Sequence, residues 1–113
     1  MKQRSDIPYL EHILDAINKI EDSVSNLFRQ EFKKSVDISD AVVRRIEVIG
    51  EAVKNISDDL KKKYSEVEWT KIAGTRDVMI HAYFNVDLDV VWDIVKKDLP
   101  SLKKHILKIL KEI

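Results

Sequence analysis

The sequence predicts an all-α protein, an antiparallel bundle of four main helices with one short extra helix. Its apolar residues recur at intervals of three and four, which is the period of a helix face. Two glycines and two prolines in 113 residues leave few of the tight turns that a sheet requires. The 44% hydrophobic and 35% charged residues are typical of a folded soluble chain. At this length we expect a single domain, residues 1–113.

The first predicted helix ends at about residue 30. Ser5 or Asp6 is expected to cap it, with Pro8 tolerated in its first turn. A linker is expected at 33–37. The apolar residues at helical spacing are Leu10, Ile13, Leu14, Ile17, Ile20, Val24, Leu27 and Phe28.

The second helix is expected to begin at a cap on Asp37 or Ser39. Glu47 and Glu51 are four residues apart and therefore share a face, which either meets Arg76 across the bundle or stays in solvent. Gly50 in mid-helix indicates close approach of another backbone. The apolar positions follow a 4-3-4-3 spacing: Val42, Ile46, Ile49, Val53 and Ile56.

The second half of the chain predicts a short helix, a third main helix and a long last helical region. Residues 57–59 cap the short helix at 60–64, the third main helix covers about 69–82, and Asp87 caps the last region. Pro100 should kink or split that region near 98–99. Its apolar seam runs through Leu88, Val91, Val95, Leu99, Leu102, Ile106, Ile109 and Ile113, with Trp92 beside it. So much apolar surface predicts that a second copy covers part of it.

One stretch, 76–83, departs from the helical pattern. On a continuous helix, Trp69, Ile72, Ala73, Ile80 and Tyr83 form one apolar stripe, and Arg76 falls in the middle of it. A guanidinium there is costly unless an anion meets it. His81 falls about 140° away, on a face with Gly74, Asp77 and Val78. Such a break in the pattern is typical of a functional site.

Several other kinds of site are not indicated. There is no cysteine, and His12 and His105 lie on other helices than His81, so we expect no metal and no cofactor. No Gly-rich phosphate loop is present. No apolar run is long enough to cross a bilayer, so a cytoplasmic protein without a membrane partner is expected. Twenty basic and twenty acidic residues argue against a large non-specific nucleic-acid footprint.

The side chains of Arg76, His81 and Tyr83 suit RNA cleavage by attack of a ribose 2′-OH on the adjacent phosphate. Histidine transfers protons near neutral pH, and the guanidinium fits a phosphate. Tyr83 adds a hydroxyl and a ring for a base. The alternative is structural: Arg76 pairs with a carboxylate of the bundle and His81 caps a helix end. A lysine face made by Lys97, Lys104, Lys108 and Lys111 either guides RNA or is simply solvated.

The stretch resembles the R-x4-H-x-Y motif of HEPN domains, in particular the HepT toxin family. Further landmarks of that family are Arg44-Arg45 before Ile49-Gly50-Glu51-Ala52, Trp69 before the motif, Val86-Asp87 with Val91-Trp92 after it, and Asp98-Leu99-Pro100. The resemblance runs from about residue 6 to 109. Asp77 stands where many relatives have Asn, which places a carboxylate beside Arg76.

The resemblance implies a HEPN-like homodimer that is the toxin of a type VII-like toxin–antitoxin pair. Arg76 would bind the scissile phosphate and His81 would transfer protons in a metal-independent endoribonuclease. An MntA-type minimal nucleotidyltransferase antitoxin would block the site by AMPylation of Tyr83. The alternative is a non-catalytic HEPN module that binds a nucleotidyltransferase partner or a nucleotide.

The helical register of the motif raises a geometric question, because Arg76 and His81 point in different directions. Either the helix loosens before His81, or the Arg76 side chain swings round, or two subunits complete one site. We predict that Arg76 and His81 of both copies converge near the two-fold axis.

Overall fold

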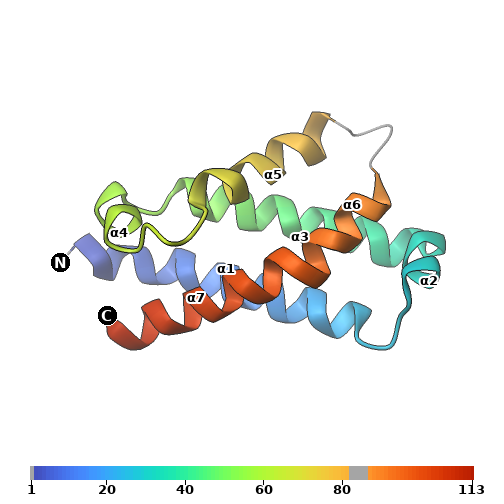
Figure 1. Ribbon diagram of the computed structural model, residues 1–113, viewed down its shortest axis with the longest axis horizontal. Coiled ribbons are helices and arrows are strands. Elements are labelled where there is room, and N and C mark those ends of the chain that lie inside the picture. The colour runs from blue at the N-terminus through green and yellow to red at the C-terminus, as the bar shows by residue number, and fades with distance from the viewer. Residues whose placement is uncertain (1, 82–86) are drawn as a thin grey trace.

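The protein is a bundle of four long helical segments. The computed structural model describes the backbone of residues 2–81 and 87–113, and the side chains of residues 5–75 and 87–113. The long segments are α1 (Lys2–Val24), α3 (Val36–Lys54), α5 (Trp69–His81) and a C-terminal run of α6 (Leu88–Asp93), the π-helical turn η1 (Ile94–Asp98) and α7 (Leu99–Glu112). Short helices α2 (Arg29–Lys34) and α4 (Asp58–Lys63) lie at opposite ends (Figure 1). Within the described residues every regular element is helical, which confirms the predicted all-α bundle.

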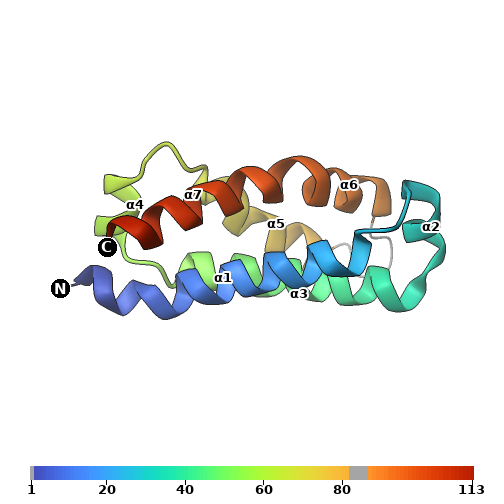
Figure 2. The same ribbon diagram turned by 90° about the horizontal axis from the view of Figure 1, so that it is seen from below.

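The core lies between α1, α3 and the C-terminal run. The predicted stripe of α3 is buried along its whole length, as is the seam of the last region except for its two end residues. Neighbouring segments run antiparallel, with α7 lying along α1 (Figure 2). Side chains with no exposed surface include Leu10, Ile13, Ile17, Ile20, Phe32, Val42, Val53, Leu60, Val91, Ile106 and Ile109.

The predicted end of the first helix at about residue 30 is wrong, because α1 stops at Val24. The Ser25 hydroxyl donates to the Asp22 carbonyl, and the Leu27 amide turns back to the Val24 carbonyl at 3.0 Å. Such short polar side chains compete with the helical hydrogen bonds. The chain then forms α2 over 29–34, which reaches into the linker expected at 33–37, and the Phe28 amide donates to the Glu31 carboxylate at 2.8 Å.

Two predicted caps are also wrong. Asp6 lies inside α1, is buried, and accepts hydrogen bonds from the Ser57 amide at 2.8 Å and the Ser57 hydroxyl at 2.6 Å. It therefore ties α1 to the start of α4. Helix α3 is capped by Ser35, whose hydroxyl accepts from the Ile38 amide, whereas Ser39 is buried within the helix. An expected start at position 37 or 39 was too late because the capping side chain precedes the first apolar residue of the helix.

Other boundaries agree with the prediction. Ser57 caps α4, and the Asp87 carboxylate caps α6 by accepting from the Asp89 and Val90 amides. Pro100 has no amide hydrogen, so the regular hydrogen bond to residue 96 is lost. One residue before the proline, the Leu99 amide donates to the Ile94 carbonyl and closes the wider π-helical turn η1.

None of the helices in the described part of the chain is both long enough and apolar enough to span a membrane.

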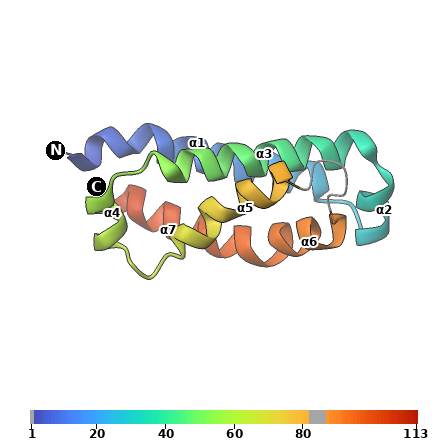
Figure 3. The same cartoon turned by 90° about the horizontal axis from the view of Figure 1, so that it is seen from above.

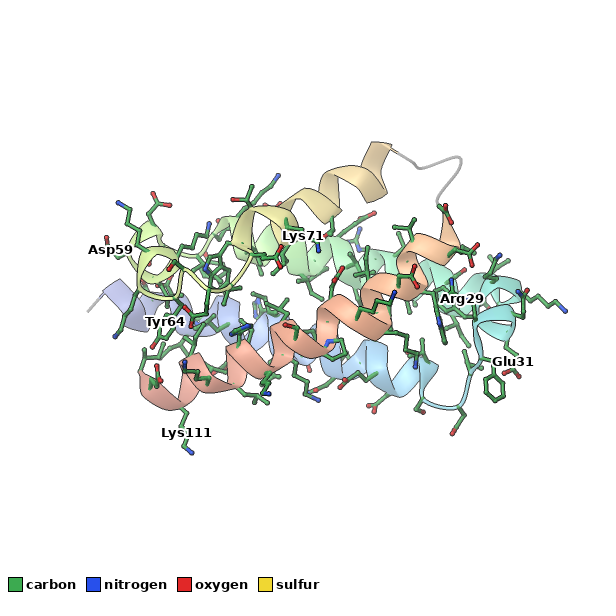
Figure 4. All side chains as sticks on the ribbon, viewed as in Figure 1. Arg29, Glu31, Asp59, Tyr64, Lys71 and Lys111 are labelled. Carbon is green, nitrogen blue, oxygen red and sulfur yellow. The ribbon has the colours of Figure 1, made fainter. Side chains whose placement is uncertain are left out.

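Helix α2 is held on α6 by one apolar and several charged contacts. The buried Phe32 ring lies 5.3 Å from the Trp92 ring. Arg29 pairs with Asp89 at 3.1 Å and with Asp93 at 2.9 Å, and Lys33 reaches Asp89 at 3.0 Å. We call this group the α2 clamp. Figure 4 shows Arg29 at this end of the bundle and Tyr64 at the other.

Candidate functional site

The backbone of α5 carries most of the candidate catalytic residues. Arg76, Asp77 and His81 all lie in its last two turns, on a helix that runs without a break to His81. Their side chains, and the whole of Tyr83, lie outside the described residues. The continuous helix contradicts the idea that α5 loosens before His81. By helical register, Arg76 and His81 are about 140° apart around its axis.

The start of α5 is fixed by Trp69. Its ring is buried, and its indole N–H donates to the Tyr64 carbonyl at 3.0 Å. The Ile72 amide then takes the Glu68 carbonyl at 3.1 Å as its helical partner. The resemblance marked Trp69 as a landmark before the motif, and the structure gives it a physical role: it sets where α5 starts, and therefore the register of Arg76.

Beyond Trp69, the described part of α5 is only half covered. Ile72, Ala73, Gly74 and Thr75 are all partly exposed. Helix α5 packs against α3, antiparallel to it, as Figure 3 shows from above. A methyl group added at Gly74 would meet no atom within 4 Å. The face of α5 at Gly74 is therefore open in the single chain.

A small cavity of about 80 Å³ lies beside α5, against α3 and the C-terminal run. Lys71 stands at its rim and pairs loosely with Asp98 at 3.8 Å and Glu68 at 4.0 Å. Figure 4 shows Lys71 pointing into the space between α5 and α7. The floor is apolar: Ile46, Ile49, Ile72, Ile94, Leu99 and Leu102. Thr75, the residue before Arg76, is one of the lining residues, so the cavity lies next to the start of the candidate segment.

Of the three supporting residues proposed from sequence, Asp77 lies on α5, and Glu47 and Glu51 lie on α3. Glu47 is half-buried and Glu51 is exposed, both on the helix against which α5 packs. Among described residues, His12 on α1 and His105 on α7 stand on different surfaces, the first in the groove described below and the second in the cavity wall. No group of three or more metal-ligating side chains occurs in the described part of the chain.

Asp89 and Tyr64, two described side chains with a shifted pKa, lie near opposite ends of the bundle. Lys33 and Arg29 lower the pKa of Asp89 by hydrogen bonding to its carboxylate. The Glu112 carboxylate, 2.7 Å from the Tyr64 hydroxyl, raises the pKa of Tyr64 to about 12. Both shifts come from contacts that join distant parts of the chain.

The structure also reveals a basic surface that sequence reasoning missed. A groove between α1 and α3 is lined by His12, Lys19, Arg44 and Arg45. A sequence signal was available, because positions 12, 15, 16 and 19 and positions 41, 44, 45 and 48 each follow the spacing of one helix face. The two faces are 22 residues apart in sequence, from position 19 to position 41, and only the packing of α1 on α3 joins them.

The family model and the relatives that match this chain all carry ribonuclease names. A family model described as "Ribonuclease HepT-like" matches residues 13–109. The "Probable ribonuclease HepT" of Thermococcus cleftensis is 43% identical over 96% of this chain and 99% of its own length. A "Putative RNase" of Caldanaerobacter subterraneus is 40% identical over 93% of this chain and 94% of its own.

A third relative is a longer protein. The "Gamma-glutamylcyclotransferase and putative RNase" of Methanocaldococcus jannaschii is 46% identical over 93% of this chain, and the chain spans 47% of that relative's length. No solved structure shows a significant match to the chain.

Proposed function

Because this chain belongs to the HepT-like ribonuclease family, we propose that it is an endoribonuclease that needs no metal ion, with Arg76 and His81 as its catalytic residues. The observation that carries the proposal is the family match over 13–109, which includes the Arg76–His81–Tyr83 motif. The unbroken helix through His81 supports it, because it fixes the relative register of the two residues.

The proposed reaction is an internal transfer at phosphorus. The ribose 2′-oxygen forms a bond to the adjacent phosphorus, the bond to the 5′-oxygen breaks, and the products are a 2′,3′-cyclic phosphate and a free 5′-hydroxyl. His81 moves protons, either from the attacking 2′-hydroxyl or to the leaving 5′-oxygen. Arg76 stabilises the extra negative charge on the phosphate oxygens in the transition state.

We further propose that two copies of the chain form the working site. Arg76 and His81 point about 140° apart on one helix, so they do not face the same phosphate easily. A second copy can place its own Arg76 or His81 opposite the first. The open face at Gly74 supports close approach of such a copy. Arg76 and His81 of both subunits would then line one cleft on the two-fold axis.

The biological setting that fits this activity is a toxin held in check by a partner. A minimal nucleotidyltransferase of the MntA type would transfer AMP to the Tyr83 hydroxyl. The added phosphate and nucleoside would fill an RNA-phosphate cleft with bulk and negative charge, which repels the substrate. Both partners and the RNA would meet in the cytoplasm.

The first experiment measures cleavage of RNA by the purified chain in the presence of a chelator. We expect the wild type to cut and to leave cyclic phosphate ends, and Arg76→Ala and His81→Ala to lose cleavage while retaining the helical circular dichroism spectrum. Cleavage by both variants would contradict the assignment. A folded wild type that binds a nucleotidyltransferase without cutting RNA would favour the non-catalytic module instead.

A second experiment tests the shared site. Arg76→Ala and His81→Ala chains are unfolded together, refolded and assayed. If each site draws on both subunits, mixed dimers regain one intact Arg and His pair and recover part of the activity. Two inactive variants that stay inactive when mixed, although they exchange subunits, would place the full site in one chain.

A third experiment tests the regulation. Co-expression with a neighbouring nucleotidyltransferase should add AMP-sized masses to the intact chain, and Tyr83→Phe should abolish them. Modification that persists in Tyr83→Phe would move the target to another residue.

A further inference from the structure

The groove between α1 and α3 is built from two matched helix faces. His12, Asp15, Ala16 and Lys19 form the α1 wall. Each wall follows the i, i+3, i+4, i+7 spacing of one helical stripe, so both stripes face the same side of the bundle. The α3 wall is formed by Ala41, Arg44, Arg45 and Val48. The small side chains Ala16 and Ala41 leave room between the helices, and the groove encloses about 480 Å³.

The groove has an excess of positive charge. Lys19, Arg44 and Arg45 face a single carboxylate, Asp15, and Lys19 already pairs with that carboxylate at 3.0 Å. Among the residues whose side chains are described, no carboxylate lies within ion-pair distance of Arg44 or Arg45. The whole sequence has a net charge of zero, so this local excess is not a consequence of a basic composition.

Two adjacent guanidinium groups without a counter-ion repel each other. A polyanion would relieve that repulsion, and each guanidinium fork matches the oxygens of a phosphate. The apolar part of the groove lining, Ala16, Ala41 and Val48, is small, and Val48 is its one large exposed apolar side chain. A groove of this kind suits a sugar–phosphate chain better than an apolar protein segment.

The position of the groove relates it to the candidate site. Helix α3 forms one wall of the groove and also packs against α5, the helix of Arg76 and His81. The two features therefore lie on either side of one helix, whose diameter with side chains is about 10–12 Å. A few nucleotides of single-stranded RNA span that distance.

We propose that the α1–α3 groove binds the phosphate backbone of RNA through Arg44 and Arg45, apart from the site at which the RNA is cut. The proposal rests on the proposed ribonuclease function for its ligand. Arg44 and Arg45 hold phosphates of a longer substrate, so they set affinity for RNA chains and leave the bond-breaking step to α5. Lys19 and His12 form the opposite wall of the same track.

The test measures binding of a fluorescent 2′-O-methyl RNA oligonucleotide, which cannot undergo 2′-OH attack, at a series of salt concentrations. Arg44→Ala/Arg45→Ala should weaken binding about tenfold at low salt. The slope of log affinity against log salt should fall by about 1.4, because each lost phosphate contact removes about 0.7 on single strands. Arg44→Lys/Arg45→Lys, which keeps the charge, should retain most of the slope.

Lys62→Ala/Lys63→Ala is the matched control, because it also removes two adjacent exposed positive charges, but on α4, away from the groove. It should leave the slope unchanged. The proposal is overturned if the control lowers the slope as much as the arginine pair does, or if the arginine pair changes the oligomeric state but not the slope. It is also overturned if the wild type shows no salt-dependent RNA binding. Circular dichroism of each variant checks the fold.

The test separates this proposal from the proposed function. If the wild type cleaves RNA and the arginine pair binds it normally, the groove assignment fails and the ribonuclease stands. If the wild type binds through the groove but never cleaves, the ribonuclease fails and the groove stands. His81→Ala should keep the full salt slope, because it leaves both arginines in place.

Discussion

The core helices and the motif helix α5 are packed very differently. Leu10, Ile17 and Ile106 have no exposed surface, whereas on α5 Trp69 alone is buried among the residues whose side chains are described. Ile72 to Thr75 are half-covered, and a small cavity lies beside them. Among the described side chains, the fully buried ones therefore lie mainly on α1, α3 and the C-terminal run, and the first turns of α5 pack against them partly exposed. Substitutions in the two regions should separate stability from activity.

The same substitution in each region gives the largest expected contrast. Ile106→Ala should cost about 2–5 kcal/mol of unfolding free energy, because it opens a hole in the closed core. Ile72→Ala should cost less than about 1.5 kcal/mol, because its side chain is only half-buried and loses less apolar contact. Urea unfolding followed by circular dichroism measures both. Equal costs would mean that α5 is as much a part of the core as α7.

The two glycines give a contrast of sign. Gly74→Ala should stabilise the chain by about 1 kcal/mol, since alanine favours the helix and its methyl group meets no atom. Gly50→Ala should destabilise it, because Gly50 is buried in α3 and the extra methyl group is added to the packed interior. Urea unfolding at a low protein concentration measures the single chain. A stabilised Gly74→Ala chain that forms weaker dimers would place a second copy on this face of α5.

Tyr64 should matter at high pH. Its raised pKa means that folding keeps the hydroxyl neutral, so its contribution is complete below about pH 10 and is lost as pH rises toward the folded value of about 12. Tyr64→Phe should cost about 1 kcal/mol at neutral pH through the lost bond to Glu112. It should also flatten the loss of stability above pH 10. Thermal melts across alkaline pH measure this, and parallel profiles for both proteins would contradict it.

The α2 clamp should give the smallest effect, at low pH. The pKa of Asp89 is lowered, so its contribution is present above the ordinary value of about 4 and is lost as pH falls below it. Trp92 fluorescence reports the docking of α2, because its ring lies against Phe32. Asp89→Asn should remove part of the acid transition. Asp15→Asn, which breaks an exposed pair on α1 with Lys19, should leave that transition unchanged.

Much of the architecture follows from the sequence alone. The apolar spacing of Val42 to Ile56 predicted a buried stripe, and that stripe is buried. Asp87, Ser57 and Pro100 each marked a boundary correctly, because capping and the missing proline amide act within one turn of the chain. The order and spacing of Arg76, His81 and Tyr83 were likewise visible without a structure, and they led to the family.

The features that depend on residues far apart in sequence were decided only by the tertiary structure. Asp6 looked like a cap and is instead a buried anchor for Ser57, 51 residues away. Helix α2 has few residues and is held by its contacts with α6. The Arg44 and Arg45 groove exists only because α1 packs beside α3. Local patterns determine helices, since their hydrogen bonds are local; grooves, clamps and buried carboxylates arise from packing, which joins residues that the sequence keeps apart.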